Sequence, residues 1–235
     1  MEAFLITPVK DSLETTRKTI EAVSKAKGNF TYRIFNDFSK SETRKFLDAN
    51  QEKFGYSVIH LEDHTQNPSP NYQLVLQMAQ QTALEHNVPL IIIESDVIIN
   101  ENTITELVTL NRRLKKTGMI GAITVDMNGN YNFPYSSEKR SKKGVAVTTR
   151  SLSFCCTLIS QQFMKDFSFR ELSQKKDWFD IFISRQSHRL GYRNYLARRQ
   201  EVLHLPHSSR PWKQMKYTNP LKYYLYKFIR HRDRI

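Results

Sequence analysis

The chain has 235 residues but only seven glycines and two cysteines. It contains neither G-x-x-x-x-G-K-[ST] nor G-x-G-x-x-G, so a glycine-rich phosphate loop is excluded. G-x-S-x-G and paired C-x-x-C are also absent, which removes the sequence signs of a strand-to-helix serine nucleophile and of a cysteine zinc site. If this chain binds a nucleoside diphosphate, a metal ion must therefore neutralise the phosphates.

The cysteines and the apolar runs give no sign of a disulfide or of a membrane span. Cys155 and Cys156 are adjacent in a strand-like run, where neighbours point to opposite faces, so we expect no disulfide between them. We interpret both as small buried residues in a reducing compartment. The longest apolar runs, Val88–Glu94 and Leu152–Ser160, fall far short of the roughly 18 residues of a membrane span. No signal-peptide pattern opens the chain, and we expect a cytoplasmic protein.

The positive charge is concentrated at the C-terminal end. From Arg185 to Ile235 there are 13 Lys/Arg and two acids, a net charge of +11 out of +13. Within Asn219–Ile235, apolar residues recur at helical spacing among the basic ones. This pattern predicts a basic amphipathic helix on the anionic inner face of a membrane. The alternative is a helix that packs on the domain, with its basic side in water.

The first half alternates short apolar runs with longer amphipathic ones. This alternation predicts an α/β fold with a mostly parallel sheet flanked by helices. The expected strands are Phe4–Val9, Tyr32–Asn36, Ser57–Leu61, Leu90–Glu94 and Met119–Val125; the expected helices are Leu13–Lys25, Glu42–Glu52, Gln73–His86 and Thr103–Lys115. In the second half we expect a strand over Leu152–Ser160, a short helix from Gln161, a helix over Asp177–Leu190, and a strand pair around Tyr192–Ala197 and Glu201–Leu205.

Two acidic corners follow predicted strands. Glu94-Ser95-Asp96 ends an apolar run of the kind found in a central buried strand. Carboxylates at such an edge suit Mg²⁺ or Mn²⁺ bridging a diphosphate, although Asp96 could instead cap a helical turn. Asp37 follows an earlier strand and could accept hydrogen bonds from a base or a ribose; the alternative is an Asx-turn or an N-cap.

Two further groups lie near the C-terminal end. Asp177 and Asp180 head a predicted helix, where a carboxylate can act as a general base or merely complement the helix dipole. His204 and His207 follow a strand-like run. Either histidine could complete a metal shell of acids, and either could be purely structural.

Taken in order, these pieces resemble family 2 of the glycosyltransferases, which have the GT-A fold. The resemblance covers about residues 3–208. Glu94 stands where the family usually has the first Asp of its D-x-D motif, and the usual acidic pair is spread out as Asp177-Trp-Phe-Asp180. The matching segments are Ile6-Thr-Pro-Val9, Phe35-Asn-Asp-Phe-Ser39, Ile91-Ile-Ile-Glu-Ser-Asp96, Ser153–Ser160, Asp180 with Arg185 and Gly191-Tyr192, and Val202-Leu-His204.

The resemblance implies an inverting, metal-dependent transfer from a nucleoside-diphosphate sugar to a glycan or lipid-linked acceptor. It implies Asp180 as the base, with Asp177 as the alternative, and Asp96 and His204 as ligands of Mn²⁺ or Mg²⁺. The donor would be held by Thr7, Pro8, Asp37, Glu94 and Ser95. The catalytic domain would cover residues 1–211, divided into a nucleotide-sugar half (1–126) and an acceptor half (127–211), and residues 212–235 would form a basic tail.

Three other functions are compatible with parts of the sequence. A nucleic-acid-binding module would explain the basic C-terminal third but not the acidic edge at Glu94-Ser95-Asp96, so we expect no nucleic acid partner. A catalytically inactive GT-A-like protein would bind without turnover. A nucleotidyltransferase usually has a glycine-rich loop near its N-terminus, and this chain has none.

Overall fold

The computed structural model describes residues 1–136, 138, 144–173, 178–206, 219 and 221. Asp177 and His207 lie outside these residues, as does the predicted tail helix except for Asn219 and Leu221. None of the helices in the described part is long and apolar enough to cross a membrane. The boundary proposed at residue 212 also lies outside the described part and stays a prediction.

The elements alternate as the sequence predicts in the first half of the chain. They are β1 (Ala3–Val9), α1 (Leu13–Ser24), β2 (Phe30–Asn36), α2 (Ser41–Ala49), α3 (Gln51–Phe54), β3 (Tyr56–His60), a 3₁₀ turn (Leu61–Asp63), α4 (Tyr72–Glu85), β4 (Leu90–Ile93), β5 (Val97–Ile98), α5 (Thr103–Arg113) and β6 (Thr117–Val125). The second half adds β7 (Val145–Thr148), β8 (Cys156–Ile159), α6 (Gln161–Asp166), a 3₁₀ turn (Phe169–Glu171), α7 (Phe179–Arg189) and β9 (Arg193–His204).

The described strands form one mixed sheet of nine strands in the order β3-β2-β1-β4-β8-β6-β9-β5, with β7 also paired to β9. β1 pairs in parallel with β2 and β4, and β6 pairs in parallel with β9. β8 is antiparallel to both β4 and β6, and β5 and β7 are antiparallel to β9. The predicted α/β fold is confirmed: β3, β2, β1 and β4 pair in parallel, and the rest of the sheet is mixed.

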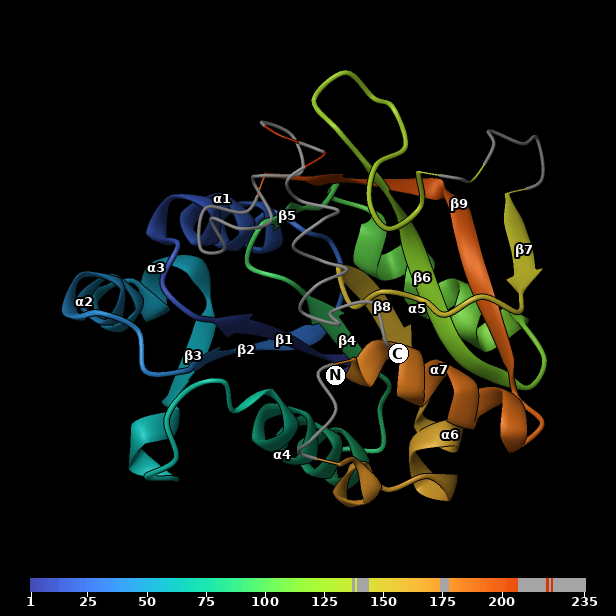
Figure 1. Cartoon of the computed structure of the whole chain (residues 1–235), viewed down its shortest axis with the longest axis horizontal. Helices are drawn as coiled ribbons and strands as arrows, with labels where there is room; N and C mark the ends of the chain where they lie inside the picture. The colour runs from blue at the N-terminus through green and yellow to red at the C-terminus, as the bar shows by residue number, and fades with distance from the viewer. Residues whose placement is uncertain (137, 139–143, 174–177, 207–218, 220, 222–235) are drawn as a thin grey trace.

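Helices cover both faces of this sheet. In Figure 1, α4, α6 and α7 lie together along its lower side, and α1 lies above it. β1 shows why the central runs are apolar throughout: Leu5 packs into one core, and its neighbours Phe4 and Ile6 pack into the other. Because alternate residues of a strand point to opposite faces, a strand buried on both sides needs apolar residues at every position.

The first correction concerns the predicted helix over Glu42–Glu52, which is interrupted. α2 ends at Ala49, Asn50 leaves helical geometry, and α3 resumes at Gln51. The Asn50 side chain donates from Nδ2 to the Phe46 carbonyl at 2.8 Å. A side-chain amide that bonds the backbone locally competes with the helical ladder, which accounts for the break.

The second correction concerns the strands of the second half. The predicted pair around Tyr192–Ala197 and Glu201–Leu205 is a single strand, β9, whose pairing with β6 shifts register between Ala197 and Glu201. The intervening polar residues form an irregularity within one strand rather than a turn between two. The predicted strand over Leu152–Ser160 is also shorter, because only Cys156–Ile159 pairs as β8.

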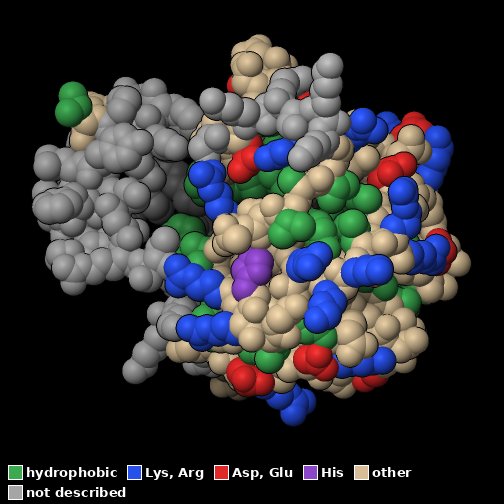
Figure 2. Space-filling view, turned by 90° about the vertical axis from the view of Figure 1, so that its right-hand side faces the viewer, with side chains coloured by type: hydrophobic (Ala, Val, Ile, Leu, Met, Phe, Trp, Pro, Cys, Tyr) green, Lys and Arg blue, Asp and Glu red, His purple; other side chains and the backbone are tan. Residues whose placement is uncertain are grey.

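One side of the molecule is strongly basic. Figure 2 shows Lys and Arg side chains spread over the side that carries β7 and β9 in Figure 1. Lys115 and Lys116 are exposed where α5 leads into β6, and Arg189 and Arg193 are exposed where α7 leads into β9. The two junctions are adjacent, because the Arg193 amide donates to the Lys116 carbonyl at 2.8 Å. The basic charge of the C-terminal third therefore begins within the folded domain.

Candidate functional site

The acidic corner lies at the carboxyl edge of β4, next to the start of β8. Ile93 pairs with Cys156, and one residue further on the Glu94 amide donates to the Cys155 carbonyl at 3.0 Å. The chain then turns at once, because the Val97 amide donates to the Glu94 carbonyl at 3.1 Å. This tight turn fixes two carboxylates at the end of a strand that is fully buried.

β9 brings His204 to the same corner. Val97 of β5 pairs with His204, and the Leu205 amide donates to the Asp96 carbonyl at 2.8 Å. As a result His204 Nε2 lies 3.6 Å from Asp96 Oδ2, with both side chains largely buried. The structure thus brings together the two residues expected to hold a metal ion, while their role as ligands stays a prediction.

A backbone carbonyl sets the orientation of the His204 ring. Nδ1 lies 3.0 Å from the Phe133 carbonyl oxygen. A carbonyl can only accept, so Nδ1 carries the proton and Nε2 faces Asp96. A ring nitrogen held in this way by a backbone carbonyl is the usual support of a metal-binding histidine. Burial alone lowers the pKa of His204, but the carboxylates of Asp96 and Glu94 outweigh it and leave that pKa raised.

Cys155 belongs to this corner as well, and the sequence analysis missed it. One ligand atom each from Glu94, Cys155 and His204 lie within 4.8 Å of one another. The Cys155 thiol donates to Glu94 Oε2 at 3.4 Å, and Ser153 Oγ lies 3.2 Å from the sulfur. Burial first, and then the Glu94 carboxylate, raise the pKa of this thiol well above its ordinary value. The two cysteines form no disulfide, as predicted.

The donor set fits a divalent cation. Two carboxylates, a correctly oriented imidazole and a thiol converge from the end of β4, the start of β8 and the end of β9. Oxygen, nitrogen and sulfur are the atoms with which proteins bind divalent metals. Ser95, between the two acids, is half-buried at the same turn.

Asp37 is engaged with the protein itself. Its Oδ2 accepts from Ser69 Oγ at 2.7 Å and from the Asn71 amide at 2.9 Å, and its Oδ1 accepts from Asn71 Nδ2 at 2.9 Å. The carboxylate therefore holds the loop that leads into α4. A carboxylate has about four acceptor sites, so one remains for a ligand.

Thr7 and Pro8 lie in β1, past the point where its pairing with β4 ends at Ile6. The Thr7 side chain is buried and accepts a hydrogen bond from Tyr32 Oη at 2.9 Å. It is therefore directed into the core, and only the backbone of this segment can contact a nucleoside. Pro8 is half-buried.

Asp180 lies in the first turn of α7 and is half-buried. Its Oδ1 accepts a hydrogen bond from the Ile181 amide at 2.8 Å. The ring of its neighbour Phe179 stacks on Tyr72, the first residue of α4, at 6.2 Å between centroids. Burial first, and then the charges of Glu94 and Asp180, raise the pKa of Tyr72 well above its ordinary value. The Tyr72 hydroxyl therefore stays protonated, and the charges of both carboxylates act on it.

Tyr72 is the second residue that the sequence analysis missed. Its hydroxyl oxygen is buried and has no hydrogen-bond partner among the described residues. Buried hydroxyls in native proteins are nearly always paired, so the Tyr72 hydroxyl is a candidate contact for a ligand. An aromatic residue at a helix start carries no such signal in the sequence.

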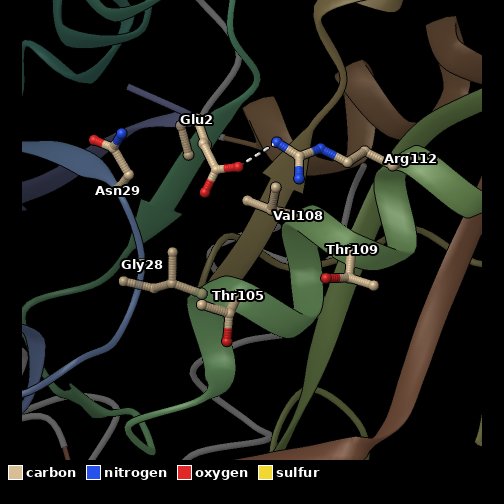
Figure 3. Close-up of a pocket in the computed structure, with 9 residues that line it drawn as sticks. Glu2, Gly28, Asn29, Thr105, Val108, Thr109 and Arg112 are labelled. Atoms are coloured by element: carbon tan, nitrogen blue, oxygen red, sulfur yellow. Dashed lines mark hydrogen bonds and ion pairs between the residues drawn. The ribbon is translucent and has the colours of Figure 1, made fainter.

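A small cavity among the described residues lies elsewhere. It has a volume of about 120 Å³ and lies between the starts of β1 and β2 and helix α5, at the opposite edge of the sheet. Figure 3 shows Glu2 and Arg112 paired across it, at 2.5 Å between Oε1 and the guanidinium. An exposed ion pair of this kind contributes little to stability. The acidic corner, and not this cavity, is the candidate site.

Comparisons with known proteins identify the family and the fold. The family model "Glycosyl transferase family 2" matches residues 4–172. No curated protein sequence matches the chain. Among solved structures, PcManGT from Pyrobaculum calidifontis, a mannosyltransferase in complex with GDP-Man and Mn²⁺, is 12% identical with a TM-score of 0.67, covering 97% of this chain and 64% of that one.

Two further structures are similar. GalNAc-T7 with UDP, GalNAc and Mn²⁺ is 12% identical with a TM-score of 0.66, covering 89% of this chain and 44% of that one. S. aureus TarS 1-349 is 14% identical with a TM-score of 0.63, covering 87% of this chain and 60% of that one. At these identities the likeness shows a shared GT-A fold. The chain spans between 44% and 64% of the length of these three proteins.

Proposed function

The chain belongs to glycosyl transferase family 2, and from this we propose that it moves a sugar from a nucleoside-diphosphate sugar to a hydroxyl group of a glycan or lipid-linked acceptor. We propose that the transfer inverts the anomeric carbon and depends on a divalent metal. The observation that carries the proposal is the corner of Glu94, Asp96 and His204 at the end of the buried strand β4. This corner occurs in a chain without a glycine-rich phosphate loop.

Asp96 and His204 are the proposed ligands of Mn²⁺ or Mg²⁺, with Glu94 beside them for the ribose or a metal-bound water. The metal would supply positive charge where the diphosphate leaves. The Phe133 carbonyl keeps His204 Nε2 directed at the corner, and β5–β9 pairing keeps Asp96 in place. The Mn²⁺ in the PcManGT and GalNAc-T7 complexes supports this choice of metal.

The donor nucleoside would lie over the ends of β1 and β2. We propose that it contacts the backbone of Thr7 and Pro8 and the remaining acceptor site of Asp37, while Ser95 contacts the sugar nucleotide near the metal. Asp37 also fixes Asn71 and hence the start of α4. Donor binding and the placement of Tyr72 are therefore linked through one carboxylate.

Asp180 is the proposed base. As the acceptor hydroxyl attacks the anomeric carbon, Asp180 would take its proton, and the bond to the diphosphate would break on the opposite side of the sugar. α7 holds Asp180 at its first turn, close enough for its charge to act on both Tyr72 and Tyr135. Asp177 remains the alternative base and lies outside the described residues.

We also propose that the protein binds an anionic membrane surface. It would then be a peripheral protein on the inner face of the membrane. We propose that residues 219–235 make this contact. The support is the helical spacing of apolar residues within a strongly basic segment, together with the exposed cations at the α5–β6 and α7–β9 junctions. Basic charge near an anionic leaflet contributes about 1 kcal/mol per residue.

One experiment tests the function directly. The full chain is mixed with a panel of nucleoside diphosphates, with and without Mn²⁺, and its thermal unfolding is followed. One diphosphate should raise Tm in the presence of metal and have little effect without it. Salt-sensitive DNA binding, combined with no metal-dependent stabilisation by any nucleotide, would favour a nucleic-acid-binding module instead.

A further inference from the structure

We infer that the Cys155 thiolate is a direct ligand of the metal ion, and that the site therefore prefers borderline or soft divalent cations such as Zn²⁺, Co²⁺ and Cd²⁺ over Mg²⁺. The inference rests on the proposed metal site and deepens it: with Cys155 bound, Glu94 contacts the ion directly rather than through a metal-bound water. The observation behind it is the group of ligand atoms from Glu94, Cys155 and His204, all within 4.8 Å of one another.

The three residues are held in position by the sheet. Glu94 and Cys155 are bonded through their backbones at 3.0 Å, next to the paired residues Ile93 and Cys156. His204 is fixed by its pairing with Val97 and by the bond from Nδ1 to Phe133. Ligands attached to rigid strands keep their geometry better than ligands on loops.

The spacing suits a single ion. With metal–ligand bonds of about 2.0–2.3 Å, a tetrahedral site holds its ligand atoms roughly 3.3–3.8 Å apart. The 3.4 Å from Cys155 Sγ to Glu94 Oε2 already lies in that range. Small rotations of the side chains would bring the remaining pairs, now within 4.8 Å, to the same spacing.

The chemistry of the donor set then determines which metals bind. A set of oxygens favours Mg²⁺ or Mn²⁺, whereas a thiolate beside an imidazole and a carboxylate favours Zn²⁺ and its borderline neighbours. As the metal–sulfur bond forms, the thiol proton is released to solvent, and one positive charge of the ion is neutralised. No oxidant or other reactant is needed.

Cys156 provides a matched control within the same chain. It is the next residue and equally buried, with exposed fractions of 1% for Cys156 and 2% for Cys155. The Cys155 thiol donates to the Glu94 carboxylate at 3.4 Å, whereas the Cys156 thiol has no such contact among the described residues. The two cysteines therefore differ in what surrounds the sulfur and hardly at all in burial.

The test is a Co²⁺ titration of the full chain, followed by absorption. A sulfur-to-cobalt charge-transfer band in the near ultraviolet should appear in the wild-type protein and in Cys156→Ser, and should be lost in Cys155→Ser. In Cys156→Ser the only thiol left is Cys155, so the band can be assigned even if Cys155→Ser does not fold. Competition titrations should show that Cys155→Ser weakens Zn²⁺ binding by at least about tenfold and changes Mg²⁺ binding far less.

Two results would overturn the inference. One is a wild-type protein that binds Co²⁺ without the charge-transfer band, and the other is a band that disappears in Cys156→Ser and persists in Cys155→Ser. The proposed function fails in a different way. If the wild-type protein shows no nucleotide binding that depends on Mn²⁺, then the metal-dependent transfer itself is wrong. If Mn²⁺-dependent nucleotide binding is present without the band, only the role of Cys155 is wrong.

Discussion

His204 Nε2 lies 3.6 Å from Asp96 Oδ2, although Asp96 lies in the turn between β4 and β5 and His204 is the last residue of β9. The contact exists because β5 pairs antiparallel with the end of β9, which places Val97 opposite His204. The proposed metal site therefore depends on a strand of two residues, β5, being correctly paired.

The first prediction concerns this pair. Asp96→Asn should abolish metal-dependent binding of a nucleoside diphosphate and leave the fold intact, because the amide keeps the shape of the side chain and removes its charge. Calorimetric titration with and without Mn²⁺ measures the effect. Unchanged affinity and metal dependence in Asp96→Asn would remove Asp96 from the metal site.

The histidines give a matched comparison. His204→Ala should weaken metal binding by at least about tenfold, the usual scale for groups that hold a metal site, and His207→Ala should have a much smaller effect. The reason is that the His204 ring is fixed between Phe133 and Asp96. A larger loss in His207→Ala would move the ligand to that residue.

The second prediction separates stability from function at Tyr72. Tyr72→Phe should stabilise the ligand-free protein by about 1 kcal/mol, because it removes a buried hydroxyl that has no partner among the described residues. The same change should weaken donor or acceptor binding, or lower kcat. Thermal unfolding and steady-state kinetics of the same variant measure the two effects.

Tyr135→Phe is the control for Tyr72→Phe. The Tyr135 oxygen accepts a hydrogen bond from the Ser153 amide at 3.1 Å, so its removal leaves a donor unpaired. Tyr135→Phe should therefore destabilise the protein by about 1 kcal/mol. Loss of stability in both variants, by similar amounts, would show that the Tyr72 hydroxyl is already satisfied in the free protein.

The third prediction tests the packing beneath α7. A Cβ added at Gly118 would lie 1.9 Å from Ser187 Oγ, so Gly118→Ala should destabilise the protein by about 1–3 kcal/mol or more. Gly55→Ala meets no atom within 4 Å and should cost only the strain of its φ of +69°, about 1–2 kcal/mol. Denaturant unfolding measures both. In a Ser187→Ala background the cost of Gly118→Ala should fall, because part of the clash is gone.

How far the sequence predicts the site depends on the kind of contact. Asp96 and Asp37 follow apolar strands, and that position is visible in the order of residues alone. Cys155 is different, because its place beside Glu94 depends on β8 lying antiparallel to β4 with Ile93 opposite Cys156. Nothing local in either segment determines that pairing or its register. In the sequence, a cysteine within an apolar run therefore cannot be distinguished from any other core residue.

The same distinction explains the errors in the fold. β1 to β4 are short, mostly apolar runs that need no partner to be recognised, and the predicted strands match to within one or two residues at their ends. The polar residues between Ala197 and Glu201 resemble a turn, but pairing with β6 carries the strand through them with a shift in register. Tertiary pairing thus overrides the local signal for a turn.

The fourth prediction concerns the tail. Deleting the chain from Asn219 should release the protein from anionic vesicles and spare its activity on a short, soluble acceptor. The reason is that the tail holds helically spaced apolar residues among dense basic charge. Vesicle co-sedimentation at two salt concentrations measures the effect, and neutral vesicles are the control. Unchanged binding, or loss of the folded state, would instead favour a helix packed on the domain.

The last prediction concerns the base. Asp180→Asn should lower kcat by about 10²–10⁴-fold, the usual contribution of a positioned proton acceptor. Donor affinity should change little, because Asp180 is proposed to contact the acceptor hydroxyl and not the nucleotide. The amide keeps the bond from the Ile181 amide to Oδ1, so the start of α7 should be preserved.

Asp177→Asn is the matched control, since Asp177 is the other acid of the Asp177-Trp-Phe-Asp180 segment and lies three positions earlier in the sequence. If Asp180 is the base, Asp177→Asn should lower kcat by less than about tenfold, with donor affinity unchanged in both variants. A large loss in Asp177→Asn with a small one in Asp180→Asn would transfer the role to Asp177. Small losses in both would leave the transfer without a proton acceptor, and the protein would then bind its nucleotide without turning it over. Because metal-dependent nucleotide binding would survive in that case, the two halves of the proposed function can be tested separately.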